Sequence, residues 1–194
     1  MILYYAPAAC SQASHIALIA AGLPHRLIKV GRDKRTEDGT DFTLINGKGY
    51  TPAFDVGDGT ILTESLAILL YIADKSGKLL AKSGLERWRA IENLAFMSSE
   101  IHKGFTPYFK GGTTLEKEDA AKTLHMRFET IAAQLRDRLF LTSDKLSVDD
   151  CYLFVMLSWA ELMGVAVPSI LVSYRKRLRD ESSVKLALNI EGVE

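Results

Sequence analysis

A cysteine near the N-terminus is the residue of this chain that is best placed to do chemistry. Cys10 follows an apolar strand-like run at residues 2–5 and precedes a segment with helical spacing that begins at Ser11. It therefore occupies a strand-to-helix turn, beside the first free backbone N–H groups of the helix. These amides and the helix dipole favour the thiolate, which is the nucleophilic form of cysteine. The alternative is an inert buried thiol, since lone cysteines are commonly small core residues.

The other candidate ligands and nucleophiles are scattered. Cys151 falls in the apolar run 151–157, which is typical of an inert core thiol. Two cysteines so far apart do not indicate a structural disulfide framework. No group of His and Cys has metal-ligand spacing, so no metal site is predicted. The histidines are His15, His25, His102 and His125.

The composition is that of a globular protein without a strong electrostatic preference. Of the 194 residues, 47% are hydrophobic and 25% charged, and Lys plus Arg equals Asp plus Glu at 24 each. This balance argues against nucleic acid or an anionic membrane as partner. No apolar run reaches the roughly 18 residues of a membrane span, and the first residues do not have the basic-then-apolar pattern of a signal segment. A cytoplasmic location is expected.

The elements that must position Cys10 alternate between strand and helix. After the strand at 2–5 and the Cys10 helix, Gly22 supplies a helix stop, and residues 27–30 form a second, parallel strand. A charged loop comes next, and then a short helix at 42–45. A hairpin (53–56 and 60–62, with a glycine-rich turn) and an apolar helix from residue 66 complete the pattern. The order β-α-β then β-β-α is the thioredoxin arrangement.

The remainder of the chain is predicted to be helical. Apolar residues recur at helical spacing from Glu86 onward, with Trp88, Leu94, Ile101 and Phe105 on one face. Further helices are expected at about 115–139, from a capping box at 147–150, from Pro168 to about 178, and as one more turn in the tail. The predicted domains are residues 1–77, a linker at 78–85 and an all-helical domain at 86–194.

Four short motifs in order carry a family resemblance. They are YYAPAACS at 4–11, GYTP at 49–52, TESLAI at 63–68 and IHKG at 101–104. Together with the capping box, they resemble the bacterial beta class of cytosolic glutathione transferases, from residue 1 to about residue 160. The resemblance implies an N-terminal thioredoxin-like domain followed by a helical bundle. It also implies a homodimer in detoxification, with glutathione as co-substrate, a hydrophobic electrophile as its other partner, and no metal.

The resemblance assigns the ends of glutathione to separate parts of the first domain. A cis Thr51–Pro52 bond would offer the Thr51 backbone to the ligand's cysteinyl backbone. Glu64 and Ser65, at a helix start, would hold the γ-glutamyl end. Lys34 would meet the glycyl carboxylate, with Arg35 as a rival.

The resemblance also names catalytic residues. Cys10 and His102 would act on the ligand thiol, with Lys103 beside them, and Tyr5 would not be the main activating group. Without the resemblance, Ser65 could be only an N-cap, and His102 could be a core histidine whose hydrogen bonds are satisfied. The full predicted glutathione set is Tyr5, Ser11, Lys34, Thr51, Pro52, Ala53, Glu64, Ser65, Glu100 and Lys103; the predicted electrophile pocket is Phe105, Tyr108 and Phe109, with Trp159 as a further candidate wall.

The sequence leaves three chemical hypotheses open. In the first, the protein activates glutathione; lowering a thiol pKa by about two units takes roughly 2.7 kcal/mol of preferential anion stabilisation. In the second, Cys10 is itself the nucleophile in thiol–disulfide or dehalogenating chemistry; because position 13 is Ala13, glutathione must then be the resolving thiol. In the third, the protein binds glutathione without catalysis, in a regulatory role.

Several positions depart from the family pattern. Gly47 replaces a proline, Ala8 and Ala9 replace a Gly-Ser pair, and Ala53 replaces a valine. These changes loosen the loop, remove a hydroxyl and shrink a side chain under the ligand. We expect a modest loss of glutathione affinity.

Overall fold

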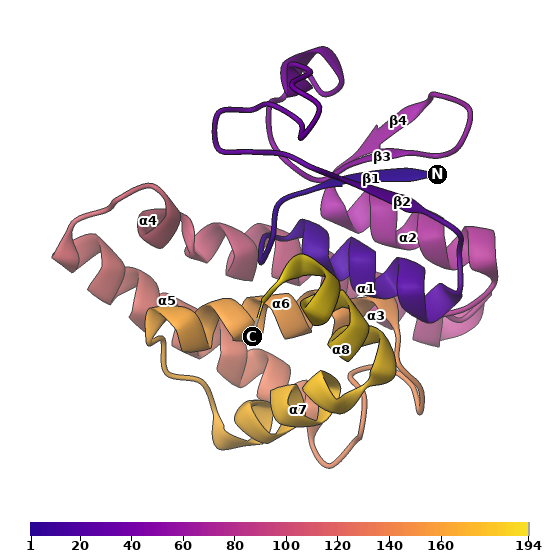
Figure 1. The fold of residues 1–194 in the computed structure, drawn as a ribbon. Coiled ribbons are helices and arrows are strands. Elements are labelled where there is room, and N and C mark those ends of the chain that lie inside the picture. The colour runs from indigo at the N-terminus through magenta and orange to yellow at the C-terminus, as the bar shows by residue number, and fades with distance from the viewer. Residues whose placement is uncertain (194) are drawn as a thin grey trace. The chain divides into compact units, whose positions relative to one another are not determined.

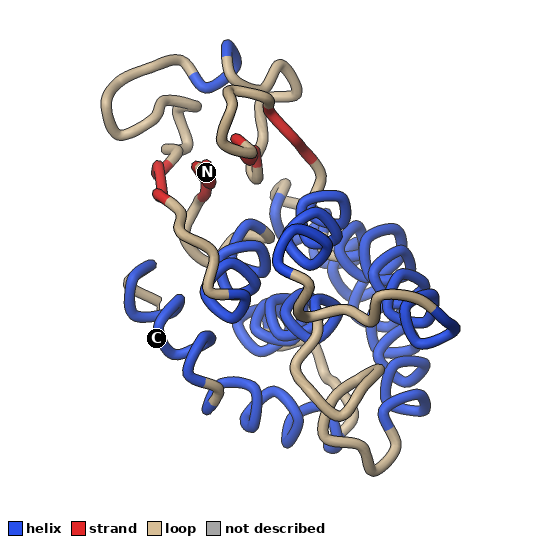
Figure 2. The backbone as a smooth tube through the Cα atoms, turned by 90° about the vertical axis from the view of Figure 1, so that its right-hand side faces the viewer, coloured by secondary structure: helices blue, strands red, loops and turns tan. Residues whose placement is uncertain are grey.

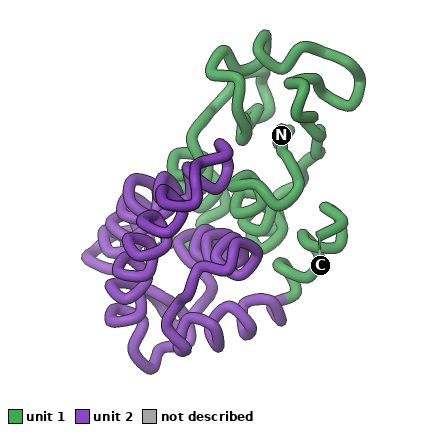
Figure 3. The backbone as a smooth tube through the Cα atoms, turned by 90° about the vertical axis from the view of Figure 1, so that its left-hand side faces the viewer, with its two compact units in different colours: residues 1–80, 182–194 green, residues 81–181 purple. Residues whose placement is uncertain are grey.

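The computed structural model describes residues 1–193. Two compact units make up the chain (Figure 3). Unit 1 contains residues Met1–Leu80 together with the segment from Ser182 onward, and unit 2 contains Ala81–Glu181. The boundary at residues 80 and 81 lies within the predicted linker 78–85.

Unit 1 is built on a four-stranded mixed sheet in the order β2-β1-β3-β4 (Figures 1 and 2). The strands are β1 (Ile2–Tyr5), β2 (Arg26–Lys29), β3 (Ala53–Asp55) and β4 (Ile61–Thr63). β1 runs parallel to β2 and antiparallel to β3, and β3 pairs with β4 as a hairpin. The predicted β-α-β and β-β-α units are therefore confirmed.

Different elements pack against the two faces of this sheet, because successive strand residues point to opposite faces. On one face lie α1 (Ser11–Ala21) and α2 (Ser65–Ser76), and Phe54 of β3 meets the Tyr71 ring of α2 at 6.0 Å. On the other face, Tyr4 packs with residues of β2, β3 and the short 3-10 helix η1 (Phe42–Leu44). The sheet is thus buried on both sides, which fixes the register of β1 and the position of the turn after it.

Local signals end α1 where the sequence predicts. Gly22 has φ +71°, a left-handed conformation that favours glycine, and its N–H bonds back to the last turn of the helix. The chain then returns through a short loop into β2 and completes the parallel crossover.

The C-terminal segment differs from the predicted domain division. The sequence pattern puts residues 182–193 in the all-helical domain with one extra helical turn, but α8 (Ser182–Glu191) is a full helix and belongs to unit 1. It packs against α1, with Val184, Ala187 and Leu188 buried (Figure 1). Hydrophobic burial on α1 therefore outweighs closeness in sequence to the other helices.

The regular elements of unit 2, within residues 81–181, are all helices. Its helices are α3 (Gly84–Phe96), the π-helical segment η2 (Met97–His102), α4 (Thr106–Phe109), α5 (Thr114–Leu135), α6 (Val148–Met163) and α7 (Ser169–Asp180). The helix expected at about 115–139 ends earlier, at Leu135, because Arg136 adopts φ +51°. The helix expected after Pro168 is confirmed.

The first helix of this unit does not bury all the apolar residues that the sequence spacing indicates. Leu94, Ile101 and Phe105 are buried as expected, but Trp88 is 63% exposed while Asn93 is buried. Trp88 precedes Leu94 by six residues, which is about 120° around an α-helix of 3.6 residues per turn, so the two side chains point to different faces.

The central helix α6 begins with the predicted capping box. The Ser147 N–H and hydroxyl both donate to the Asp150 carboxylate, at 2.8 and 2.7 Å. Asp150 also accepts from the Leu141 N–H at 2.7 Å and from the Tyr174 hydroxyl. Within the described residues, no helix has the length and apolar character required to span a membrane.

Candidate functional site

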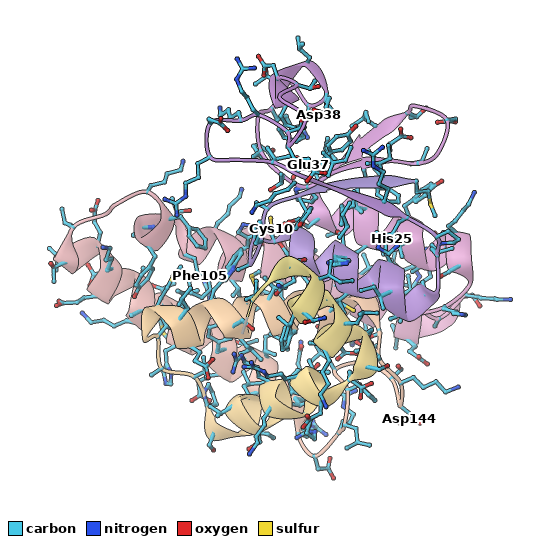
Figure 4. All side chains as sticks on the ribbon, in the orientation of Figure 1. Cys10, His25, Glu37, Asp38, Phe105 and Asp144 are labelled. Carbon is cyan, nitrogen blue, oxygen red and sulfur yellow. The ribbon has the colours of Figure 1, made fainter. Side chains whose placement is uncertain are left out.

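Cys10 sits directly before the first turn of α1 (Figure 4). Its thiol is buried, with 9% of the residue exposed, and the Sγ–H donates to the Thr51 carbonyl oxygen at 3.5 Å. The Cys10 and Ser11 amides and the Ser65 side chain also hydrogen-bond to this sulfur. One thiol therefore meets the starts of two helices and the loop before β3.

The protonation of Cys10 is set mainly by burial. Desolvation raises the pKa of the Cys10 thiol, and the nearby Glu64 charge raises it further. The hydrogen bonds from Ser65 and from the backbone lower it but do not compensate. The expectation that the helix start alone would favour a thiolate is therefore wrong for this structure, because the cost of burying the anion is larger.

The start of α2 lies at the same thiol. Ser65 is the first residue of α2 and is 7% exposed, and no side chain caps this helix end. Glu64, which precedes it, has φ +71°, and the Ser65 side chain that follows lies at the Cys10 thiol. An uncapped helix N-terminus can bind a carboxylate, in agreement with the predicted role of Ser65.

The loop before β3 has the backbone form that the resemblance implied. The Thr51–Pro52 peptide bond is cis. The Thr51 carbonyl accepts from Cys10, and Ala53 is the fully buried first residue of β3. Thr51, Pro52 and Cys10 are therefore brought together as expected.

Glu64 has side-chain partners in the structure, Lys48 and Tyr50. Its Oε1 lies 2.5 Å from the Lys48 ammonium and accepts from the Tyr50 hydroxyl at 2.9 Å, and Lys48 also bonds the Thr63 hydroxyl at 2.9 Å. The hydrogen bond to Glu64 raises the pKa of both Lys48 and Tyr50. A ligand amine would therefore join a carboxylate that already carries a cation.

Lys34 lies beside the same loop. A Cβ placed on Gly49 would be only 3.0 Å from the Lys34 ammonium, which therefore reaches toward the segment before Thr51. Its rival Arg35 instead donates to the Gly39 carbonyl at 2.9 Å, within its own loop. Between the two, the geometry favours Lys34 as the cation near the site.

Two predicted contacts have structural partners. The Ser11 hydroxyl donates to the Ala6 carbonyl at 3.1 Å and accepts from the Ala6 N–H at 3.2 Å. The Ser11 side chain thus closes the turn, and only its amide faces the sulfur. The Tyr5 ring packs 6.3 Å from that of His15, and burial raises the pKa of Tyr5, which is consistent with the expectation that it is not the activating group.

The second group of predicted residues lies in unit 2, on and after the π-helical segment. His102 Nδ1 lies 2.7 Å from the Tyr152 hydroxyl, and the His102 ring meets the Trp159 ring edge-to-face at 5.0 Å. Lys103 is exposed, and Glu100 pairs with Arg127 at 2.9 Å. His102 is therefore held in one orientation by its aromatic neighbours.

Gly104, which follows Lys103, packs closely against α5. A Cβ at Gly104 would lie 2.7 Å from the buried Leu124 side chain of α5. The glycine of the IHKG motif therefore permits the close approach of α5 directly after His102 and Lys103.

The predicted electrophile pocket divides into core and surface. Phe105 is fully buried, with its ring 5.6 Å from Trp159 and 6.5 Å from Phe128. Phe105 therefore packs in the aromatic core with Trp159 and Phe128 and does not line an open surface. Phe109 is 49% exposed and stacks edge-to-face on Trp159 at 4.7 Å, while Tyr108 donates to the Lys117 carbonyl at 3.0 Å. Phe109 is the most exposed member of the set.

Sequence reasoning missed four residues that make contacts at Glu64 or at the turn and helix around Cys10. Lys48, Tyr50, His15 and Glu191 gave no local signal, since each acquires its partner only through folding. Tyr50 was inside a quoted motif, but nothing in the motif pointed to its hydroxyl. Among residues 1–193, no three His, Cys, Asp or Glu side chains gather in a way that could hold a metal ion.

Comparison with known proteins identifies the family. A model of the glutathione S-transferase N-terminal domain matches residues 8–75. Glutathione S-transferase GstA of Escherichia coli O157:H7 is 34% identical over 201 residues, covering all of both chains.

Solved structures give the same result. A sphingomonad glutathione S-transferase complexed with glutathione is 35% identical, and the bacterial beta-class glutathione S-transferase of Sphingomonas chungbukensis is 36% identical. Each match covers all of both chains at a TM-score of 0.91. The expected two-part fold, the resemblance to the bacterial beta class and the expected glutathione transferase function are therefore confirmed. The chain belongs to the glutathione S-transferase family.

Proposed function

We propose that this protein binds reduced glutathione at the Cys10 end of unit 1 and transfers its sulfur to electrophilic small molecules. The observation that carries the proposal is the convergence of the α1 start, the α2 start and the Thr51 carbonyl on one buried thiol. Glutathione has a carboxylate and amine at one end, a thiol in the middle and a carboxylate at the other end. The residues around Cys10 offer a partner for each.

Each contact follows from the chemistry of the groups present. The uncapped start of α2 at Ser65 suits the γ-glutamyl carboxylate, and Glu64 suits the ligand amine. The Lys34 ammonium suits the glycyl carboxylate. Ala53, at the start of β3, leaves room under the cysteinyl portion. From unit 2, His102, Lys103 and Glu100 are proposed to act on the ligand, and Phe109, backed by Phe105 and Tyr108, is proposed to contact the electrophile.

The reaction is a nucleophilic substitution by the glutathione sulfur. The thiol loses its proton, the sulfur forms a bond to the electrophilic carbon, and a leaving group such as chloride departs with the bonding electrons. Helix-start amides and the Ser65 hydroxyl stabilise an anionic sulfur near Cys10. Because burial raises the pKa of Cys10 itself, a neutral Cys10 beside the ligand thiolate is favoured over Cys10 as the nucleophile.

Thiol–disulfide chemistry remains a second activity of the same site. In this reaction the Cys10 thiolate attacks the glutathione sulfur of a substrate–glutathione mixed disulfide, the S–S bond breaks and the substrate thiol leaves. A glutathione thiolate then attacks the Cys10–glutathione disulfide, which releases Cys10 and forms oxidised glutathione. We propose this as a slower reaction than conjugation. It needs the Cys10 sulfur, whereas conjugation needs only the surrounding groups.

The assembly and location are also proposals. A homodimer is supported by apolar side chains on the surface of α3, where Leu85 is 69% and Trp88 63% exposed. A cytoplasmic location agrees with two free cysteines that form no disulfide with each other. Neither nucleic acid nor a membrane is proposed as a partner, because the charges balance.

The decisive experiment compares Cys10→Ala with the matched control Cys151→Ala. Cys151 is a fully buried thiol in α6 with a strongly raised pKa, so it should not react. We expect Cys10→Ala to keep conjugation of a chloronitrobenzene substrate within about tenfold while losing disulfide reduction. Cys151→Ala should keep both activities. Calorimetry with reduced glutathione measures binding in all three proteins.

The outcomes separate the alternatives. Loss of both activities in Cys10→Ala, with binding retained, would mean that Cys10 is the true nucleophile. Binding without turnover in the parent protein would support a non-catalytic glutathione-binding role. No heat of binding in the parent protein would remove the proposal altogether.

A further inference from the structure

The C-terminal helix carries a buried carboxylate that reaches the turn before Cys10. Glu191 is the last residue of α8, and its side chain is fully buried. Its Oε2 accepts from the Ala8 N–H at 3.2 Å and from the Gln12 side-chain amide at 3.0 Å. Its Oε1 accepts from His15 Nδ1 at 2.8 Å. All of these residues belong to unit 1, where α8 packs against α1 (Figure 1).

The stability of α8 does not explain this carboxylate. A negative charge at the C-terminal end of a helix is opposed by the helix dipole. Burying a carboxylate also costs free energy unless hydrogen bonds replace its water. Glu191 instead lies against the N-terminal half of α1, where the dipole of that second helix favours an anion. Its three donors all come from α1 or from the turn that leads into it.

The turn that Glu191 binds is the one that presents Cys10. Ala8 has φ +57°, a conformation that residues other than glycine rarely adopt. The Ala9 N–H closes the turn on the Ala6 carbonyl at 3.1 Å, and the Ser11 hydroxyl joins both backbone groups of Ala6. Ser11 therefore holds this turn from one side. Glu191, 183 residues away from Ala8 in sequence, holds it from the other.

We propose that Glu191 is a positioning residue for Cys10, which fixes the Ala8 turn and thereby the direction and exposure of the thiol. It touches neither the sulfur nor a ligand in this role. The consequence for catalysis depends on the proposed function, because it is through Cys10 and its neighbours that glutathione would be oriented. The effect on the thiol itself does not depend on glutathione.

Two substitutions separate the parts of the contact. Glu191→Ala removes both acceptor oxygens and with them all three hydrogen bonds. Glu191→Gln keeps one acceptor oxygen for Ala8 and Gln12, but its amide can satisfy His15 only if the ring proton moves to Nε2. That nitrogen is buried with no hydrogen-bond partner among residues 1–193, so the exchange is unfavourable. Glu191→Gln should therefore give an intermediate effect.

The readout is the rate at which iodoacetamide alkylates Cys10, followed by mass spectrometry in a Cys151→Ala background. We expect Glu191→Ala to change this rate about tenfold, the loss corresponding to about one buried hydrogen bond, and to move its pH profile. Glu191→Gln should change it about threefold. The amide resonances of Ala8 and Cys10 should shift in both variants.

A matched control tests whether the effect is only lost stability. Val184→Ala, two turns earlier on the same helix, deletes buried methyl groups without touching the carboxylate. It should lower the unfolding temperature and leave Cys10 alkylation unchanged. Equal alkylation changes in Val184→Ala and Glu191→Ala would overturn the proposal, as would a parent-like rate and pH profile in Glu191→Ala.

A further variant covers the case in which Glu191→Ala does not fold. Gln12→Leu removes one donor from the carboxylate and leaves α8 intact; a changed alkylation rate supports the proposal, and an unchanged rate in both Gln12→Leu and Glu191→Gln rejects it. Glutathione calorimetry is run in parallel. If the parent protein binds no glutathione while the Glu191 variants still alter Cys10, the positioning role stands and the proposed function fails.

Discussion

Two helix starts in this protein treat their free backbone amides in opposite ways. At the start of α6, the Ser147 and Asp150 side chains form a complete capping box in a buried setting. At the start of α1, Cys10 occupies the N-cap position and no side chain caps the helix. The start of α2, which meets the same thiol, also has no side-chain cap.

The comparison indicates where binding free energy is available. A capped helix end has already satisfied its amides, so its contribution goes into stability. An uncapped end retains donors and a dipole that an anionic ligand can use. Unit 1 therefore leaves the helix starts at Cys10 without a side-chain cap, while unit 2 uses its central helix start to hold its fold together.

The largest effect is expected from Asp150→Ala. The substitution deletes the acceptor of Leu141, Ser147 and Tyr174, and leaves these donors buried. We expect the free energy of unfolding of unit 2 to fall by about 3–5 kcal/mol. Chemical denaturation followed by tryptophan fluorescence measures this loss. The comparison would fail if Cys10→Ala were equally destabilising.

The pH dependence of stability provides a second test of the capping box at the start of α6. Burial, and next the charge of Asp149, raise the pKa of Asp150 to about 7 from an ordinary 3.8. The folded state binds the Asp150 proton more tightly than the unfolded state does. Protonation of Asp150 therefore stabilises the folded protein, and this stabilisation is fully present below the unfolded pKa. It is lost as pH rises through the folded pKa, so stability should fall by roughly 2–4 kcal/mol between about pH 4 and 7.

Asp150→Asn should remove this slope, because an amide does not titrate. Asp144→Asn, at an exposed loop position, is the matched control and should leave the slope unchanged. Denaturation midpoints at several pH values measure both. An Asp150→Asn protein that retains the parent slope would show that another group causes it.

A smaller effect is expected at the uncapped end. Ser65→Ala removes a hydrogen bond that lowers the pKa of Cys10, so the pKa should rise further. At a fixed pH below the pKa, alkylation of Cys10 should slow by up to about tenfold. Ser147→Ala is the counterpart at α6, and should lower stability by about 1–2 kcal/mol without changing alkylation. Reversed effects of the two serines would contradict the comparison.

The smallest effect on stability is expected from Lys48→Met. The Lys48 and Glu64 side chains are 48% and 53% exposed, so solvent screens their ion pair and it should contribute little to stability. In the proposed binding mode Lys48 would compete with the ligand amine for Glu64, so we expect glutathione to bind the variant a few-fold more tightly. Calorimetry measures this change. Weaker binding would mean that Lys48 itself contacts the ligand.

Local patterns in the sequence determined much of the molecule. Strand and helix spacing, the Gly22 stop and the 147–150 capping box predict their elements correctly, because each depends on residues within a few positions of one another. The position of Cys10 at a strand-to-helix turn follows from the same signals. The four motifs around residues 10, 51, 65 and 102 were sufficient to indicate the family.

Tertiary structure decided what those local signals could not. The return of α8 to α1, with Glu191 beside Ala8, joins residues 183 positions apart, and no local pattern encodes such a contact. The direction of the Cys10 pKa shift depends on burial, which is a property of everything packed around the thiol. Sequence alone therefore indicated which residues are candidates for the chemistry, whereas their protonation and orientation come from the assembled unit, because desolvation and long-range hydrogen bonds exist only after folding.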